Sequence, residues 1–485
     1  MNNIVYLEKR DVYSYPDKTF AYSPSQRYPE YPFNDIADKP NPVYDMVRSC
    51  LIGMELDSEH YGQTCWNPLG DVIEKCSTVL LKPNLVRHYN QSAEDGLDCM
   101  VTHPSVIRAI ADYALIALGG TGKIIIGDAP VQSCDFSKLM ETYGYNEITS
   151  FYKDRGLDIP FLDFRLVSSA VDSSGILVST KIGKETSCIA VNMGRESAFY
   201  KLMPEQAKKL RITNYDPNEM FKHHHDDIHE YLIPKIILNA DVVINLPKPK
   251  THRKAGVTIA LKNLVGLNGN KDWIPHHTQG SLAQGGDEYF HKSLFKYWQT
   301  FLSERIDIAN LKGQRKRSRF YRLLQLIVGR LGKPFLMDNF YEGSWYGNDT
   351  IWRTICDLNR ILLYADKKGY ITNKPQRKLF ILADMIISGE GEGPLMPVSK
   401  QAGIIAAGQQ ALAFDQTIAT LMGFDINKIS SINNADYGDL IKVPMGEPLI
   451  RSNNLCWDHC NVGELRQKKT LKFKPTSGWI GHIER

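Results

Sequence analysis

Basic, amide and carboxylate side chains follow three short apolar runs of the sequence, each at the point where the run stops. The runs are 78–81, 123–126 and 241–244. The polar residues that follow them are Lys82, Asn84, Asp128, Lys248, Lys250 and His252. Lysines bind phosphates and carboxylates through charge-assisted hydrogen bonds, and a histidine exchanges protons near neutral pH. The pattern therefore predicts a site that binds an anion and moves a proton.

A second basic and amide pair stands a few residues further on, in Leu261–Gly266, where a short helical pattern holds Lys262 and Asn263. Five basic or titratable side chains also crowd the seven residues from Lys248 to Lys254, and two prolines stiffen this loop. We expect lysines to bind the anion and the amides to orient it, with His252 or Asp128 moving protons. The expected substrate-binding residues are Lys82, Asn84, His103, Lys248, Lys250, Lys262 and Asn263.

The acidic counterpart lies in the segment 383–394, where glycines alternate with glutamates. Carboxylate oxygens are ligands that Mg²⁺ and Ca²⁺ prefer, and a carboxylate also serves as a general base. We expect Asp384 to be catalytic and Glu390, Glu392 and Asp415 to bind a divalent cation such as Mg²⁺. A surface turn that needs glycine for its backbone is the alternative for each glutamate.

The elements that must position these residues form an α/β fold. Apolar runs of four residues, including a fourth at 379–382, are typical of strands buried on both faces of a parallel sheet. Between the first two runs, apolar residues from Val106 to Leu118 recur at helical spacing, after Pro104 and before Gly119. Ligands of open α/β sheets bind at the carboxyl ends of the strands, where the polar residues stand.

A basic amphipathic helix is predicted within residues 312–333. Eight lysines and arginines occur there without any acidic residue, and six apolar residues from Phe320 to Leu331 share one stripe. Such a helix is typical of a peptide that lies in a membrane interface. The alternative is a helix that packs its apolar stripe on the protein body and keeps its basic face in water.

The composition excludes several classes of protein. The chain has 485 residues, 43% of them hydrophobic, with 58 basic and 54 acidic side chains, so it has a globular core and no charge excess typical of nucleic-acid binding. The nine cysteines are an odd number and are not densely spaced, so no disulfide scaffold is expected. The first residues lack the apolar stretch of a signal peptide, and no run of eighteen apolar residues occurs. We therefore expect a cytoplasmic protein.

The order and wording of these motifs resemble the "domain of unknown function 362" family. The resemblance is carried by Lys82-Pro83-Asn84, Thr102-His103-Pro104, Gly127-Asp128, Lys250-Thr251-His252, Lys262-Asn263, Asp384 with Glu390-Gly391, and Asp415. It implies that the basic and acidic clusters belong to one domain and face one cleft. Some members of the family carry ferredoxin-like cysteine runs, whereas this sequence has no Cys-x2-Cys-x2-Cys run.

These observations predict an N-terminal arm at 1–75, a core at 76–270 and 376–485, and an insertion at 271–375. We expect an enzyme that acts on a phosphorylated or carboxylated small molecule, or on a lipid-linked glycan intermediate. The alternative is a non-catalytic adaptor that lies on the inner face of a membrane through 312–333 and binds an anionic ligand or partner. An iron–sulfur redox protein is the third and least favoured reading.

Overall fold

The main sheet of the computed structural model is mixed, and most of its strand pairs are parallel. The structure describes residues 3–92, 95–172, 177–200, 202, 204–212, 216, 218–435 and 447–485. The strand order is β17-β1-β16-β15-β11-β2-β3-β4. Strands β15, β11, β2, β3 and β4 are parallel neighbours, whereas β16 is antiparallel to both β15 and β1. The predicted α/β class is confirmed.

The four predicted strands are all present. They are β2 (Thr78–Pro83), β3 (Lys123–Asp128), β11 (Val242–Leu246) and β15 (Lys378–Glu392). Val79 and Leu81 face one hydrophobic core, and Leu80 between them faces the other. The runs are continuously apolar because both faces of these strands are buried. The remaining strands of the sheet are β1 (Ile4–Lys9), β4 (Phe161–Asp163), β12 (Lys250–His252), β13 (Gly256–Thr258), β16 (Met396–Gly408) and β17 (Leu449–Ser452).

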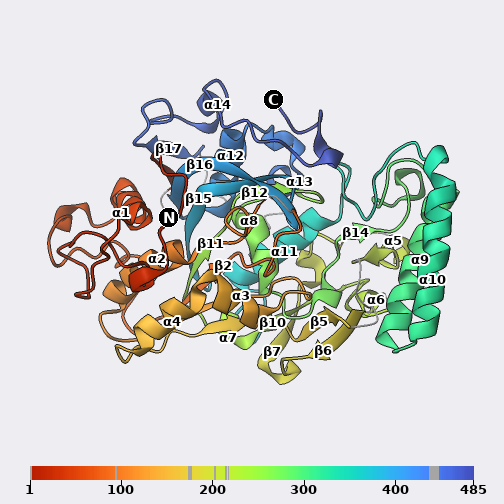
Figure 1. The fold of residues 1–485 in the computed structure, drawn as a ribbon, viewed down its shortest axis with the longest axis horizontal. Coiled ribbons are helices and arrows are strands. Elements are labelled where there is room, and N and C mark those ends of the chain that lie inside the picture. The colour runs from red at the N-terminus through yellow and green to blue at the C-terminus, as the bar shows by residue number, and fades with distance from the viewer. Residues whose placement is uncertain are drawn as a thin grey trace.

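Helices cover both faces of the sheet (Figure 1). One core contains α1 (Pro42–Gly53), α2 (Pro104–Leu118), α3 (Phe136–Tyr143) and α4 (Tyr145–Lys153). The other contains α8 (Ala260–Asn263), α11 (Ile351–Tyr364) and α12 (Ala411–Met422). The predicted helix α2 begins at Pro104, after the His103 N-cap, and ends at Gly119, whose φ of 57° is in the left-handed region. Shorter helices are α5 (Pro204–Ala207), α6 (Met220–His223), α7 (Lys235–Leu238), α13 (Ser430–Asn433) and α14 (Val462–Leu465).

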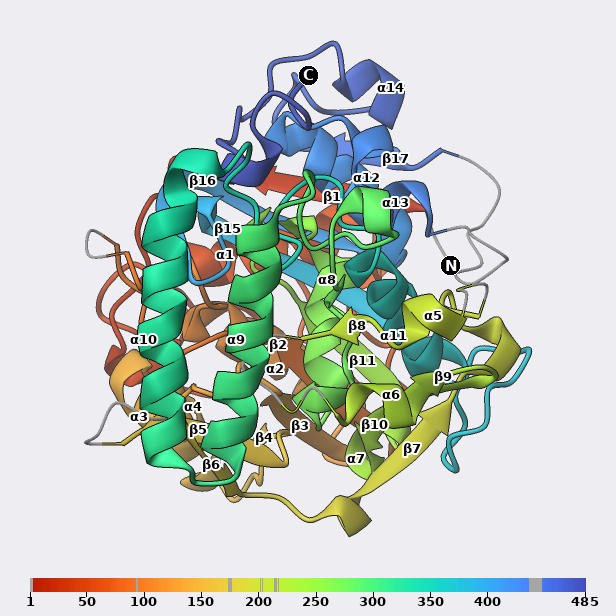
Figure 2. The ribbon, with the colours of Figure 1, turned by 90° about the vertical axis from the view of Figure 1, so that its right-hand side faces the viewer.

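The N-terminal segment 1–75, predicted as an arm, contributes a strand and a helix to the core. Strand β1 lies between β16 and β17 in the main sheet, and Figure 2 shows it in red among the blue strands. Helix α1 packs on α2, and its Tyr44 is fully buried. Sequence reasoning missed β1 although its apolar run 4–7 is of the same kind as the runs that predicted β2, β3, β11 and β15.

Two antiparallel helices, α9 (Leu294–Leu311) and α10 (Arg315–Gly332), form a hairpin at one side of the molecule. They lie side by side in both views, and Figure 2 looks directly onto them. Small sheets lie nearby: β5 (Val167–Val171) with β6 (Leu177–Lys181), β8 (Leu210–Arg211) with β14 (His277–Thr278), and β7 (Cys188–Asn192) with β10 (Ile228–Pro234) and β9 (His224–His225).

Candidate functional site

A cavity of about 530 Å³ opens at the carboxyl ends of β2, β3 and β11. Its walls come mainly from the loop after β2, the end of β3, the segment 250–276 and the α9–α10 hairpin, and the β5–β6 pair, Ile212, Glu342 and Leu395 also contribute. Of the residues predicted from the sequence, Asn84, Asp128, Lys250, His252, Lys262 and Asn263 line it. The structure therefore brings together side chains that are up to 179 residues apart.

A buried ion pair supports the floor of the cavity. The Lys82 Nζ lies 2.8 Å from the Asp128 Oδ1 and also donates to the Pro83 carbonyl at 2.8 Å. The other Asp128 oxygen accepts the Leu85 amide, and Oδ1 accepts that of Ala129. Both oxygens of Asp128 are occupied, so the geometry gives this carboxylate a positioning role. Lys82 does not line the cavity.

Amide side chains link the strand ends beneath the cavity. The Asn84 Nδ2 donates to the Asn263 Oδ1 at 2.7 Å, and the Asn263 Nδ2 donates to the Asn245 Oδ1 at 2.7 Å. The Asn84 Oδ1 accepts a hydrogen bond from Lys250 at 2.5 Å. Lys250 also donates to the carbonyls of Met100 and Lys248, which fixes its Nζ. Burial and the nearby Lys248 hold the pKa of Lys250 well below its usual range.

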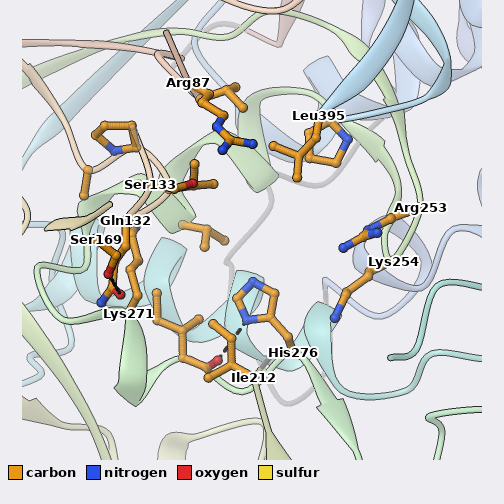
Figure 3. Close-up of a pocket in the computed structure, with 18 of the residues that line it drawn as sticks. Arg87, Gln132, Ser133, Ser169, Ile212, Arg253, Lys254, Lys271, His276 and Leu395 are labelled. Atoms are coloured by element: carbon orange, nitrogen blue, oxygen red, sulfur yellow. Dashed lines mark hydrogen bonds between the residues drawn. The ribbon is translucent and has the colours of Figure 1, made fainter. Parts of the chain in front are cut away.

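Three further lysines line the cavity, and their amines have no hydrogen-bond acceptor or carboxylate partner among the described residues. They are Lys254, Lys262 and Lys271. Burial lowers the pKa of Lys254 and of Lys262 to about 8 and that of Lys271 to about 7. Figure 3 shows Lys254 and Lys271 on opposite sides of the cavity. Amines that are buried and unpaired favour a negatively charged ligand.

Two histidines face the cavity in opposite hydrogen-bonding states. The His252 Nδ1 accepts the backbone amides of Lys254 and Ala255 at 3.1 Å, so the proton of the neutral ring lies on Nε2. The His276 Nδ1 donates to the Ile274 carbonyl at 2.8 Å, drawn as a dashed line in Figure 3, which leaves a lone pair on Nε2. Burial, together with nearby lysines, holds the pKa of both rings well below 6.5. The two neutral rings form a donor and an acceptor for a proton.

The predicted residues Asp384, Lys248 and His103 lie in a second cluster outside this cavity. The Lys248 Nζ lies 2.9 Å from Asp384, and the Tyr15 hydroxyl donates to Asp384 and accepts from Lys248, both at 2.5 Å. The His103 ring stacks on that of Tyr15 with 3.9 Å between centroids. Tyr15 comes from the N-terminal segment, so this segment closes the cluster. Nothing in the sequence around Tyr15 distinguishes it from the other tyrosines there.

The three carboxylates predicted to bind a cation do not come together. Asp415 accepts the amides of Ala260 and Leu261 at the start of α8. Glu390 accepts the Lys474 amide and Glu392 that of Ser477. Throughout the described ranges, no three His, Cys, Asp or Glu side chains are placed to bind a metal ion. Each of these carboxylates accepts a backbone amide, a group that needs a hydrogen-bond partner when it is buried.

Sequence reasoning missed Lys271 and His276. Both lie just beyond the Lys262–Asn263 motif, but the domain boundary placed after residue 270 assigned them to the insertion. A usable signal was present, because basic residues continue past that boundary through Lys271, His276 and His277.

Comparisons with known proteins agree with the resemblance seen in the motifs. The chain is 26% identical over 198 residues to the "Thylakoid-associated protein sll1697" of Synechocystis sp. (strain ATCC 27184 / PCC 6803 / Kazusa). The aligned region covers 41% of each of the two chains, so this chain spans less than half of that relative's length. Residues 79–172 and 165–420 match the family described as "Domain of unknown function (DUF362)". This match includes every residue of the cavity named above, and the chain belongs to the DUF362 family.

Proposed function

We propose that this protein is an enzyme that binds a small phosphorylated or carboxylated molecule in the cavity and transfers a proton to or from it. The carrying observation is that Lys254, Lys262 and Lys271 all line the cavity, and that their amines have no acceptor within the described part of the chain. A cavity of about 530 Å³ has the usual size for a small-molecule site.

The charge balance of the cavity supports an anionic ligand. Its three carboxylates are Asp128, Asp307 and Glu342, of which Asp128 is paired with Lys82 and Glu342 lies 3.6 Å from Arg253. An anion between the lysine amines raises their pKa values and so draws protons onto them. An anionic ligand therefore compensates the positive charge of the lysine amines, which burial alone disfavours.

The two histidines have different proposed roles in proton transfer. With its lone pair on Nε2, His276 takes a proton from the bound ligand, and His252 donates one through its Nε2–H. Their closeness supports this division, because a charge on His276 lowers the pKa of His252. This assignment keeps His252 among the catalytic residues and replaces Asp128 and Asp384 as proton acceptors with His276.

The test is the binding of inorganic phosphate to the intact protein, measured by thermal shift and by titration calorimetry. We expect Lys262→Gln and Lys271→Gln each to weaken binding about tenfold or more, since a hydrogen bond to a charged group contributes about 1.5–3 kcal/mol. Lys235→Gln, on the exposed surface of α7, is the matched control. Equal phosphate affinity in all four proteins would show that the cavity is not the anion site. Native mass spectrometry of freshly purified protein then identifies any retained ligand.

As a second function, we propose that the protein lies on the cytoplasmic face of a membrane. The observation that favours it is the outer face of the α9–α10 hairpin, which carries apolar side chains into water. The name of the Synechocystis relative associates that protein with a membrane system. No helix in the described segments is both long and apolar enough to cross a bilayer, so the contact proposed is with the surface. Flotation with vesicles tests it.

A further inference from the structure

We infer that the ligand of the cavity is the phosphate-bearing head group of a membrane lipid, taken up while the α9–α10 hairpin lies on the bilayer. This inference rests on the proposed function, since it names the class of molecule that the cavity binds. It joins two features that are separate in the sequence: the basic cavity and the amphipathic helix.

Helix α10 packs on α9 through small and polar residues. Ser318 donates to Asn310 at 2.6 Å, Gln325 donates to the Gln299 carbonyl, and a Cβ on Gly332 would meet the Phe295 ring at 2.8 Å. Ser318, Gln325 and Gly332 repeat every seven residues and so lie on one side of the helix. The seam of the hairpin therefore uses the side of α10 without large apolar residues.

The apolar stripe of α10 consequently points into water. Phe320 is 56% exposed, Leu323 57% and Leu331 62%. At 100° per residue, these positions lie opposite the seam. The alternative in which the stripe packs on the protein body is therefore not what the structure shows. Along α9 and the segment after α10 the exposure continues, with Leu294, Tyr297, Trp298, Leu311, Phe335 and Met337.

This concentration of apolar surface is unusual within the molecule. Among the described residues 27 large apolar side chains are exposed, and 11 of them lie between 294 and 337. The same region carries the eight basic residues from Lys312 to Lys333, with no acidic residue among them. Only Arg315 of these eight pairs with a carboxylate in the described part of the structure. Apolar side chains flanked by unpaired cations match a bilayer with anionic lipids.

The opposite side of the same hairpin is a wall of the cavity. Ile306, Asp307 and Asn310 of α9 and Arg322 of α10 line it. The distance between membrane and cavity is therefore no more than the thickness of one layer of helices, about 10 Å. A head group that leaves the bilayer at the edge of the hairpin enters the cavity directly.

The rim of the cavity has the polarity that an amphiphile needs. Val171 and Leu177 of the β5–β6 pair line the cavity, and Val171 is 66% exposed, so apolar side chains extend from the interior to the surface. The Arg315 side chain lies 3.0 Å from Asp172 and ties α10 to this rim. Acyl chains would remain at the rim and in the bilayer while the phosphate reaches the lysines. A phosphate monoester carries about two negative charges and three acceptor oxygens, so it can accept hydrogen bonds from the lysine amines that line the cavity.

Two variants separate the two surfaces. The outer-face variant combines Leu323→Gln with Leu331→Gln, both of which are exposed, and Leu455→Gln, at an exposed position away from the hairpin, is its control. The cavity variant combines Lys262→Gln with Lys271→Gln. Each full-length protein is sedimented with vesicles of phosphatidylcholine alone or of phosphatidylcholine and phosphatidate in a three to one ratio. Each is also titrated with dihexanoyl phosphatidate, which is soluble, and with inorganic phosphate.

We expect the wild type to sediment with the phosphatidate vesicles and to bind dihexanoyl phosphatidate. The outer-face variant should lose at least about tenfold in vesicle binding, because two apolar side chains that would be buried in the bilayer are removed. It should bind the soluble lipid normally. The cavity variant should sediment but bind neither soluble probe.

Phosphate binding without sedimentation of the wild type would overturn the inference and leave the proposed function standing. The inference would also be overturned if the wild type sedimented with vesicles but the cavity variant still bound dihexanoyl phosphatidate as tightly as the wild type. If the cavity variant bound both soluble probes as tightly as the wild type, the proposed function would be overturned as well.

Discussion

Lys271 is expected to lower the stability of the folded protein and to contribute to ligand binding. Its amine is buried in the cavity, has no acceptor among the described residues, and has a pKa lowered by burial to about 7. In the unfolded chain the same amine keeps its ordinary pKa near 10.4. Between these two values the unfolded state binds more protons than the folded state, so the free energy of unfolding rises with pH in this range.

Replacement of Lys271 by methionine should therefore have opposite effects on stability and binding. At neutral pH we expect Lys271→Met to raise the melting temperature of the ligand-free protein by about 3 °C, because the penalty for a buried, partly charged amine disappears. Phosphate binding should weaken about tenfold or more. Calorimetry at neutral pH and near pH 10 measures both, and the stability gain should shrink at the higher pH. A lower melting temperature at neutral pH would indicate that Lys271 has a structural role instead.

The two cavity histidines should differ in tautomer while both stay neutral. Because the His252 Nδ1 accepts backbone amides and the His276 Nδ1 donates to a carbonyl, we expect the Nε2–H form of His252 and the Nδ1–H form of His276. Nitrogen-15 NMR of histidine-labelled protein distinguishes these forms, with His252→Gln and His276→Gln used to assign the signals. Both rings should stay neutral to a pH well below the ordinary histidine pKa, because burial and nearby cations lower their pKa values. His60, whose pKa is raised by its hydrogen bond with Asp57, should be protonated first. The same tautomer in both rings would contradict the donor and acceptor roles.

Residue types alone placed six of the predicted residues in the lining of the candidate site. Lys250, His252, Lys262 and Asn263 could be predicted because each stands at the end of a strand or in a short motif next to one. Lys248 and Asp384 have the same sequence signal, yet they pair with each other and with Tyr15. A strand end leaves open which of two neighbouring polar side chains faces a ligand and which faces a partner, because that depends on what packs above the edge.

At the scale of elements, strands could be predicted more fully than the parts that pack on them. Short apolar runs identify β2, β3, β11 and β15, since a strand buried on both faces has no polar alternative. The place of strand β1 between β16 and β17 and the outward orientation of the α10 stripe depend on contacts with distant segments, which no local pattern encodes. The periodicity of α10 predicted an amphipathic helix correctly, but the seam through Ser318 and Gly332 decides which face is exposed.

The turn that carries Gly266 offers a test of how the elements hold the cavity floor. A Cβ at Gly266 would lie 2.0 Å from the Asp128 Oδ1 and 2.8 Å from the Lys82 Nζ. Gly266→Ala should therefore separate this buried pair, at a cost of about 3–5 kcal/mol in the free energy of unfolding. Urea unfolding measures the change. Gly96→Ala, where an added Cβ meets nothing within 4 Å, should leave the midpoint unchanged. Equal urea midpoints for the two variants would show that the Lys82–Asp128 pair accommodates the added Cβ without loss of stability.

At the scale of the whole molecule, the net charge of +4 is the sum of separated groups. The lysines of the cavity and the basic residues of α10 are gathered around one helical hairpin, and Arg322 of α10 itself lines the cavity. Acidic residues such as Glu390, Glu392 and Asp415 accept backbone amides elsewhere. Composition near neutrality could not predict this division, because it depends on which side of each element faces the cavity, the core or water.

This division predicts an uneven pattern of hydrogen exchange. Helix α10 buries only Ser318 and Gly332, so its amides should exchange much faster than those of β2, β3 and β11, which lie between two cores. Anionic phosphatidate vesicles should slow exchange in α9 and α10, because bilayer contact covers the exposed stripe, and should slow it in the segment 250–276 as the head group enters the cavity. Vesicles of phosphatidylcholine alone are the control. The Lys262→Gln and Lys271→Gln double variant should keep the protection of α10 and lose that of 250–276. If the protection of 250–276 persists in this variant, the membrane stabilises the cavity region without placing a ligand in it. If vesicles leave exchange in α10 unchanged, the hairpin is not the membrane contact.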